Sequence, residues 1–337
     1  METKRLSDCA SDLLEAAELL KNGQVVGIPT ETVYGLAADA RNPQAVRQIF
    51  AAKGRPADNP LIVHLADIRQ LGEIAAEVPP LAEKLAERFW PGPLTMILPK
   101  QAQIPEITSG GLDTVGVRMP SHPVARALIL LSGAPIAAPS ANISGYPSPT
   151  TAEHVIRDMQ GKIAAVVDGG ACSVGVESTV IALESADTVR ILRPGFVTAE
   201  MLGTVVPHVT LDPAILHQLQ EGQAVRSPGM KYQHYSPHAH VILVEGTWNA
   251  FADLVQQQAE TGICALVFDG EGKDLSVPCL TYGSDDQEQA QQIFSKLREF
   301  DDMNAQKVYV RAPKPEGIGL AVYNRLIRAA GFEVIQV

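Results

Sequence analysis

The sequence is poor in cysteine, and none of its cysteines is placed for pairing. Its 4 cysteines, Cys9, Cys172, Cys264 and Cys279, lie far apart in the 337 residues, with no C-x-x-C pair. Zinc ribbons and disulfide frameworks depend on closely spaced or paired cysteines. The spacing therefore argues against both and fits a reducing compartment.

Positive charge is also scarce. Lys and Arg number 27 against 38 Asp and Glu, which gives a formal net charge of −11. The acidic excess is present in both halves, with 17 basic against 22 acidic residues over 1–205 and 8 against 14 over 241–337. A protein that binds nucleic acid through its phosphates presents a basic surface. We therefore expect no stable nucleic-acid binding by either half.

Long apolar runs are absent as well. No stretch approaches the roughly 20 apolar residues that a helix needs to cross a bilayer. Near the N-terminus, Asp12, Glu15 and Glu18 interrupt the apolar residues, a pattern typical of an amphipathic helix rather than of a signal peptide. The sequence thus predicts a cytoplasmic protein without a membrane segment.

The sequence does contain alternating strand and helix signals, in a chain long enough for two domains. Asn42 is the predicted N-cap of one helix, with Pro43 at its first position and Gly54 at its end. Strands are expected at residues 25–29, 61–65, 94–98, 114–118, 136–138, 163–167, 179–183 and 189–192. Helices are expected at residues 43–53, 67–76, 80–89 and 123–131, and before Lys162.

Residues 206–240 differ in composition from the rest of the chain. They contain five of the 8 histidines and the run SPGMKYQHYSPHAH, and we expect them to link a domain over 1–205 to a second domain over 241–337. The spacing of His234, His238 and His240 would also suit a metal ion. No Cys or acidic residue joins them, so no metal site is predicted. From Val241 onward strands and helices alternate regularly, which predicts parallel pairing in a small Rossmann-like α/β domain.

Two cations follow the predicted helix that ends at Gly54. Lys53 and Arg55 lie where this helix gives way to an extended Arg–Pro segment, with Asn59 shortly after them. The planar fork of an Arg and the point charge of a Lys can together bind a polyphosphate. The alternative is an ordinary helix end, where the helix dipole favours cations.

A second polar segment, APSANISGYPSPT at residues 138–150, follows a predicted buried strand. Ser140, Asn142 and Ser148 offer hydrogen-bond donors, and Gly145 allows a ligand to approach the backbone. Such clusters are often plain turns. This one, however, lies directly after a strand, where open α/β sheets bind ligands.

These segments belong to a larger set that occurs in a fixed order. It also includes PTETVYGLAADA at 29–40, WPGPLT at 90–95, VRMPSHP at 117–123, DGGACSVGVESTV at 168–180 and LRPG at 192–195. In this combination the first two hundred residues resemble the YrdC-like domain of the threonylcarbamoyl-AMP synthases. The run SPGMKYQHYSPHA and the closing GIGLAVYNRLIRAAG resemble the long form of that family, which adds a second domain.

The resemblance implies a fold and a reaction. The fold would be a YrdC-like twisted mixed-sheet α/β domain, a linker that folds over the active site, and a smaller Rossmann-like parallel α/β domain. The enzyme would be a nucleotidyltransferase that converts L-threonine, bicarbonate and ATP into L-threonylcarbamoyladenylate, pyrophosphate and water. Mg²⁺ would accompany the phosphates. A downstream tRNA threonylcarbamoyl transferase complex would use the product to form N6-threonylcarbamoyladenosine in ANN-decoding tRNAs.

The resemblance also assigns roles to individual residues. Lys53 and Arg55 would be catalytic, and no residue is expected to bind a metal. The ATP-binding residues would be Lys53, Arg55, Asn59, Thr114, Ser140, Asn142, Ser148, Arg193 and Tyr235. The threonine-binding residues would be Thr32, His64, Arg118, Ala138 and Ser178.

Other interpretations remain open for several of these residues. Thr32 can cap a turn, His64 can be a core histidine, Ser178 can be a plain strand residue, and Arg118 can form a structural ion pair with Asp113 or Glu177. At the level of function, the alternatives are an RNA-binding YrdC-like protein and a carbamoyl-adenylate-forming enzyme of the hydrogenase-maturation type. The acidic charge argues against the first, and the lack of acylphosphatase and zinc-finger modules argues against the second.

The paired cations lead to a first prediction. Replacing Lys53 or Arg55 by Ala should lower the rate of adenylate formation by about 10-fold to 100-fold, because each change removes one charge-assisted contact to a phosphate, worth roughly 1.4–2.7 kcal/mol. Folding should change little, since neither cation belongs to the apolar pattern. Release of pyrophosphate measures the effect, and wild-type rates in both variants would exclude a phosphate site at these residues.

Overall fold

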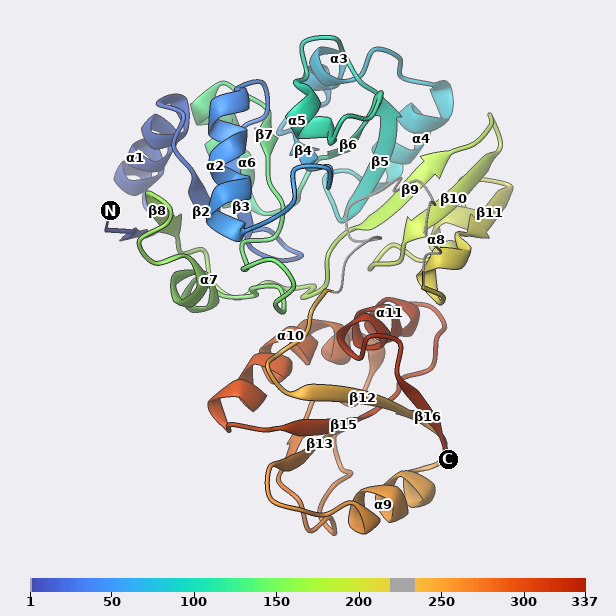
Figure 1. The fold of residues 1–337 in the computed structure, drawn as a ribbon. Helices are drawn as coiled ribbons and strands as arrows, with labels where there is room; N and C mark the ends of the chain where they lie inside the picture. Colours follow the sequence, from blue (N-terminus) through green and yellow to red (C-terminus); the bar gives the residue numbers. More distant parts are fainter. Residues whose placement is uncertain (1, 219–233) are drawn as a thin grey trace.

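The computed structural model describes residues 2–218 and 234–337, which form two α/β domains stacked one above the other (Figure 1). The first domain is built on an 11-stranded sheet and the second on a 5-stranded sheet. Pairing in the first sheet is mixed, and pairing in the second is parallel throughout. The fold class predicted from the sequence is therefore confirmed. No helix in the described residues is long and apolar enough to cross a membrane.

The first sheet has the strand order β1-β8-β2-β3-β7-β4-β6-β5-β9-β10-β11. Its strands are β1 (Lys4–Leu6), β2 (Val26–Ile28), β3 (Gly35–Asp39), β4 (Ile62–His64), β5 (Leu94–Pro99), β6 (Thr114–Arg118), β7 (Ile136–Ala137), β8 (Ala165–Val167), β9 (Thr179–Leu183), β10 (Thr188–Arg193) and β11 (His208–Leu211). Its α-helices are α1 (Ala10–Lys21), α2 (Pro43–Lys53), α3 (Leu71–Ile74), α4 (Pro80–Phe89), α5 (Glu106–Ser109), α6 (Pro123–Ser132), α7 (Ala152–Met159) and α8 (Ala199–Gly203). Two 3₁₀ turns, η1 (Ile68–Gln70) and η2 (Pro213–Ile215), complete it.

The ends of α2 are set by the residues that the sequence suggested. The side chain of Asn42 accepts hydrogen bonds from the backbone N–H groups of Gln44 at 3.0 Å and Ala45 at 3.2 Å. Gly54 ends the helix with a φ of +62°, a conformation that glycine adopts without steric cost. As a result Lys53 occupies the last turn of α2, directly beside the 138–150 segment.

Strands β1, β3 and β11 were not predicted from the sequence. β3 is built largely from glycine and alanine, which have low strand propensity, although it lies fully inside the sheet. β1 and β11 are edge strands with several exposed side chains, so their apolar pattern is weak. β11 pairs in parallel with β10, and the first sheet thus extends into the segment that we expected to be a linker. Residues 219–233 of that segment lie outside the described residues.

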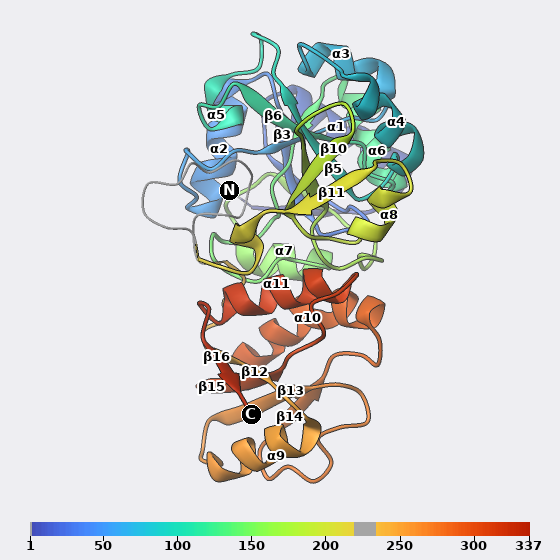
Figure 2. The ribbon, with the colours of Figure 1, turned by 90° about the vertical axis from the view of Figure 1, so that its right-hand side faces the viewer.

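The second domain contains strands in the order β14-β13-β15-β12-β16. These are β12 (His240–Glu245), β13 (Ile263–Val267), β14 (Cys279–Thr281), β15 (Lys307–Arg311) and β16 (Val334–Gln336), and the helices are α9 (Trp248–Gln257), α10 (Asp286–Asp302) and α11 (Gly319–Ala329). Helices α10 and α11 lie on the side of the sheet that faces the first domain, and α9 lies on the opposite side (Figures 1 and 2). The long helices of the second domain therefore form its contact with the first.

The contact between the domains includes both apolar packing and buried charge. Val33 and Val176 of the first domain belong to the same buried cluster as Phe294 of α10 and Tyr323 of α11. Arg298 and Arg325, on the same two helices, are 1% and 0% exposed. The interface is therefore continuous with the core of the second domain.

Candidate active site

A cleft opens in the first domain beside the ends of β4 and β6. The empty space within it, open solvent included, is about 730 Å³. The walls come from segments inside residues 30–35, 53–64, 138–145 and 177–178, together with Arg118, Arg193, His234 and Tyr235. Polar side chains from distant parts of the sequence thus converge on one hollow.

On one side of the cleft, Lys53 supports the polar loop. Its side chain is buried, with 2% exposed, and its Nζ donates hydrogen bonds to the backbone carbonyls of Ser140 and of Asn142, the second at 2.6 Å. Burial, together with the nearby guanidinium of Arg55, keeps the pKa of Lys53 well below its usual range. The expectation that folding would hardly depend on Lys53 is therefore corrected, because Ala at this position would leave two carbonyls of the loop without their donor.

Arg55 also lines the cleft and is half-buried. Its Nη2 donates to the backbone carbonyl of Pro60 at 3.2 Å. The 138–150 loop opposite carries Ser140 and Asn142, and Gly145 there has a φ of +90°. A guanidinium, small polar side chains and a glycine backbone are together suited to a bound phosphate chain.

On the other side of the cleft, Arg118 at the end of β6 is surrounded by partners that fix its orientation. Its Nη2 lies 2.7 Å from Oε1 of Glu31, and its Nη1 donates to the hydroxyl of Thr32 at 2.9 Å. Burial alone would raise the pKa of Glu31, but the guanidinium of Arg118 outweighs burial and the pKa is lowered. Arg118 does form an ion pair, and its partner is Glu31 rather than Asp113 or Glu177.

His64 ends β4 next to Arg118 and is also buried, with 3% exposed. Burial, and then the charge of Arg118, lower the pKa of His64 to about 3. Its Nδ1 lies 3.2 Å from the carbonyl of Ile62. The imidazole is therefore neutral at physiological pH and contributes hydrogen bonding, not charge, to this wall.

Ser178 is fixed by two neighbours, Arg193 and Thr95. Arg193 donates to its carbonyl from Nε at 3.1 Å and from Nη2 at 2.9 Å, and also from Nη2 to its hydroxyl at 3.2 Å. The hydroxyls of Thr95 and Ser178 are 2.8 Å apart. Burial lowers the pKa of Arg193 to about 10, so this guanidinium stays charged beside the cleft.

The second domain supports the wall of the cleft through Arg325, which binds the lining residue Glu177. Its Nε donates to Oε2 of Glu177 at 2.9 Å, and Oε1 of Glu177 accepts a hydrogen bond from the hydroxyl of Ser148 at 2.5 Å. Burial would raise the pKa of Glu177, but Arg325 and Arg193 outweigh it and the pKa is lowered. Glu177 is thus an ionised carboxylate, buried in the wall and neutralised from the other domain.

His234 and Tyr235 bring the end of the linker into the same site. Tyr235 is 5% exposed and has a φ of +66°, and its ring centroid lies 5.1 Å from that of Phe294. Arg325 lies over the same ring at 5.8 Å. Burial, followed by the charge of Arg55, lowers the pKa of His234 to about 3.

Of the 14 site residues predicted from the sequence, 11 line the cleft, and Asn59, Thr114 and Ser148 do not. Ser148 does not line the cleft itself, but its hydroxyl donates a hydrogen bond to the lining residue Glu177. Asn59 is buried next to Pro60, and Thr114 begins β6, at the opposite end of that strand from Arg118. Whether Asn59 and Thr114 contact a nucleotide stays a prediction.

The predicted site residues did not include Thr30, Glu31, Glu177 or His234, which lie at the cleft or support its walls. Glu177 had been considered only as a partner of Arg118, and His234 only as a metal ligand. Each of the four lies within one or two residues of a residue that was assigned, so adjacency was the available signal. Arg325 lies within the closing motif GIGLAVYNRLIRAAG, but that motif did not indicate its partner Glu177, which is 148 residues away.

Known proteins similar to this chain span its whole length. A family model named for Sua5, YciO and YrdC, and described as "Telomere recombination", matches residues 18–195. A second, "Threonylcarbamoyl-AMP synthase, C-terminal domain", matches residues 197–331. The threonylcarbamoyl-AMP synthase of Pyrococcus abyssi is 46% identical over 331 residues, which cover 96% of this chain and 95% of the relative. That of Bacillus subtilis is 45% identical over 343 residues, with 99% and 97% covered.

The similarity extends to three dimensions. The crystal structure of P. abyssi Sua5 complexed with L-threonine superposes with a TM-score of 0.92 at 43% identity, and all of each chain is covered. Both domains and their relative arrangement are therefore similar in the two proteins.

The buried histidines lead to a prediction about pH. Because the pKa of His64 is about 3 in the folded protein and about 6.5 in an unfolded chain, its contribution to stability is complete above pH 6.5 and is lost as the pH falls. Between pH 7 and pH 5 the free energy of unfolding should drop by about 2 kcal/mol on account of this residue. Urea titrations at both pH values measure this decrease. In His64→Gln the free energy of unfolding should fall between pH 7 and pH 5 by about 2 kcal/mol less than it does in wild type. The exposed His208→Gln serves as control and should behave as wild type; an unchanged pH dependence in His64→Gln would contradict the assignment.

Proposed function

The chain belongs to the threonylcarbamoyl-AMP synthase family, whose members make threonylcarbamoyl-AMP from threonine, bicarbonate and ATP for tRNA modification, and from this premise we propose how its cleft carries out the reaction. The side formed by Arg55, Lys53 and the 138–150 loop binds the phosphates of ATP. The side formed by Arg118, Thr32, His64, Ala138 and Ser178 binds L-threonine. The observation that supports this proposal is that residues of both predicted sets line the same cleft.

Threonine binding depends on the fixed orientation of Arg118. Glu31 and the carbonyl of Gly92 hold two of its guanidinium nitrogens, which orients the group within the wall. A carboxylate that leaves water needs a cation or several donors in fixed positions. The Arg118 guanidinium, with the hydroxyls of Thr32 and Ser178 beside it, supplies both for the threonine carboxylate.

The reaction then proceeds in two steps. The amine of threonine attacks the carbon of bicarbonate, and water leaves, which forms the N-carboxylate. An oxygen of this carboxylate attacks the α-phosphorus of ATP, the bond from the α-phosphorus to the bridging oxygen breaks, and pyrophosphate leaves with the electron pair. No covalent bond to the protein is needed, so the chain contributes positioning and cationic stabilisation of the phosphate charge.

The two cations of the phosphate side act differently. Arg55 contacts the phosphates directly. Lys53, whose Nζ is bound to the carbonyls of Ser140 and Asn142, shapes the loop around them. Asn142, Ser148, Asn59, Thr114, Arg193 and Tyr235 complete the proposed nucleotide site.

Mg²⁺ enters this scheme with ATP. Among the described residues, no group of three or more His, Cys, Asp or Glu side chains could hold a metal ion. Glu177, the carboxylate of the cleft wall, is already bound by Ser148 and Arg325. Phosphate oxygens and water would therefore coordinate Mg²⁺, which is its usual arrangement with nucleotides.

The adenylate is a mixed anhydride that must be passed on. The net charge of −11 disfavours direct binding of tRNA by this chain. We therefore assign the transfer step to a separate tRNA threonylcarbamoyl transferase complex, in agreement with the family resemblance and against an RNA-binding role.

The function is tested by its requirement for all three substrates. Incubation with ATP, L-threonine and bicarbonate should release pyrophosphate, and omission of any one should abolish release, because the nucleophile forms only when threonine and bicarbonate are both present. Arg55→Ala should lower the rate by at least about 10-fold. Pyrophosphate release that persists without threonine would contradict the proposal.

A separate prediction concerns the side of the cleft assigned to threonine. Serine lacks only the methyl group, so it should be a poorer substrate by about 10-fold to 200-fold, the value of one methyl in an apolar pocket. Arg118→Ala should weaken threonine binding and leave ATP binding nearly unchanged. Calorimetric titration with each ligand distinguishes the cases, since equal loss of both would mean that Arg118 serves only to stabilise the fold.

A further inference from the structure

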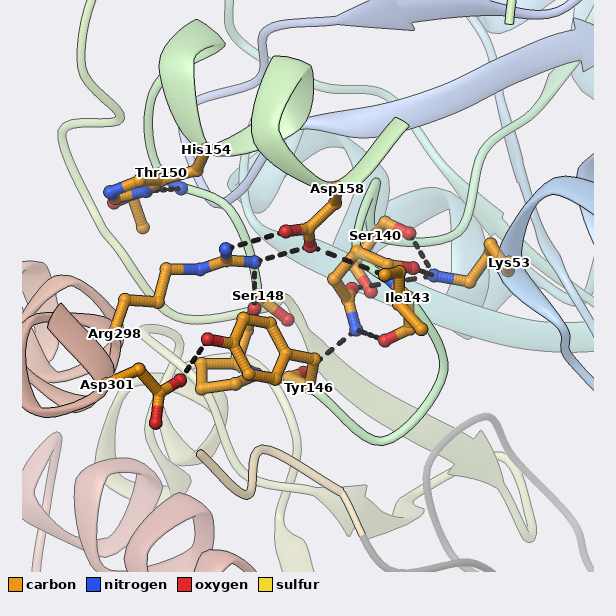
Figure 3. A network of polar contacts seen from close by, with 12 residues as sticks. Lys53, Ser140, Ile143, Tyr146, Ser148, Thr150, His154, Asp158, Arg298 and Asp301 are labelled. Carbon is orange, nitrogen blue, oxygen red and sulfur yellow. Dashed lines mark hydrogen bonds and ion pairs between the residues drawn. The ribbon is translucent and has the colours of Figure 1, made fainter. Parts of the chain in front are cut away.

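The 138–150 loop, which carries Ser140, Asn142 and Ser148, is held partly by residues outside its own domain. Helix α10 of the second domain approaches the loop and places Arg298 and Asp301 against it (Figure 3). Arg298 is 1% exposed and is thus among the most deeply buried charged side chains of the described residues. A buried guanidinium needs acceptors close by, and the acceptors of Arg298 are Asp158 of α7 and the backbone carbonyl of Pro147 in the loop.

Arg298 makes a bidentate ion pair with Asp158 of α7. Its Nη1 donates to Oδ1 at 2.9 Å and its Nη2 to Oδ2 at 2.7 Å. Nη2 also donates to the backbone carbonyl of Pro147 at 2.6 Å, and the guanidinium carbon lies 4.7 Å from the ring centroid of Tyr146. One side chain of the second domain therefore contacts two residues of the loop and the helix behind it.

The contacts continue from Arg298 to the opposite side of the loop. Oδ2 of Asp158 accepts a long hydrogen bond from the N–H of Ile143 at 3.4 Å. The side-chain amide of Asn142 donates to the carbonyls of Ile143 and Tyr146, both at 2.8 Å. Lys53 in turn donates to the carbonyl of Asn142. Lys53 and Arg298 thus hold the loop from two sides (Figure 3).

Asp301, one turn further along α10, reinforces the same arrangement. Its carboxylate accepts hydrogen bonds from the hydroxyl of Tyr146 and, at 2.8 Å, from the N–H of His238. Tyr146 is therefore fixed by its hydroxyl as well as by its ring. The shape of the loop depends on α10 at both Pro147 and Tyr146.

A second ion pair between the same two helices provides a contrast. Arg157 of α7 and Asp302 of α10 lie 2.5 Å apart, but their side chains are 47% and 57% exposed. This pair joins the domains without contacting the loop, and exposed pairs contribute little to stability. Arg157 thus offers a matched control for Arg298.

We propose that Arg298 is a positioning residue for the ATP phosphate site, through its contacts with Asp158, Pro147 and Tyr146. By this means the second domain sets the geometry of a loop that belongs to the first. The inference rests on the proposed function, because it takes the 138–150 loop to be the one that binds ATP.

The test compares substrate dependence in variants of the full-length chain. Arg298→Met keeps an unbranched apolar stem and removes the guanidinium with its donors and charge, so KM for ATP should rise by about 10-fold or more while KM for threonine stays within twofold. Arg298→Lys keeps the positive charge and can keep one of the hydrogen bonds, so its KM for ATP should lie between those of wild type and Arg298→Met. Asp158→Asn, a smaller change, should raise KM for ATP by about 3-fold to 10-fold and decides the question if Arg298→Met does not fold. Arg157→Met should match wild type in both constants.

The outcomes separate this inference from the proposed function. Equal increases in both KM values, or a lower kcat with both KM values unchanged, would show that Arg298 only joins the domains, and would overturn the proposal. If Arg55→Ala raises KM for ATP and neither Arg298→Met nor Asp158→Asn does so, the proposed function stands and the positioning role falls. If wild type forms no adenylate from the three substrates, the proposed function itself fails.

Discussion

The buried ion pair between Arg325 and Glu177 is the contact on which the arrangement of this protein depends. Glu177 lies in the wall of the cleft, where its carboxylate accepts from Ser148 and its backbone leads into Ser178. Removing the guanidinium from such a carboxylate would leave a buried charge without compensation, at a cost of about 3–5 kcal/mol. Arg325 is 0% exposed and belongs to the second domain. Full compensation of the Glu177 charge, and with it this part of the cleft, therefore involves both domains.

The same reasoning applies to the other charges around the cleft. Arg118 is paired with Glu31, Arg193 with the carbonyl of Ser178, and Lys53 with the loop carbonyls. Each cation is held by fixed acceptors, so little reorganisation is needed when a charged ligand arrives. Electrostatic preorganisation of this kind suits a reaction in which the protein forms no covalent bond.

Much of the fold was predictable because its signals are local. Asn42 and Gly54 mark the ends of α2 within a few residues, and the regular alternation after Val241 correctly predicted a parallel sheet. β3 and β11 were missed because strand formation there depends on neighbouring strands rather than on side-chain pattern. The residues that form the cleft were found largely through the family motifs. Glu31 and Arg325, the ion-pair partners of Arg118 and Glu177, were not identified from the sequence. Ion pairs between residues far apart in the chain, 148 residues for Arg325 and Glu177, leave no pattern in local spacing.

The sequence distance between Glu177 and Arg325 also has a consequence for synthesis of the chain. The 148 residues that separate them take about 7–30 s to translate at ordinary rates of 5–20 residues per second. Late in this interval the first domain has been synthesised, and its cleft contains a carboxylate whose partner Arg325 has not yet been made. The 138–150 loop likewise lacks its contacts with Arg298 and Asp301 until α10 has been synthesised. A nascent chain can therefore acquire the shape of the first domain early, but it completes the active site only when its last long helix emerges.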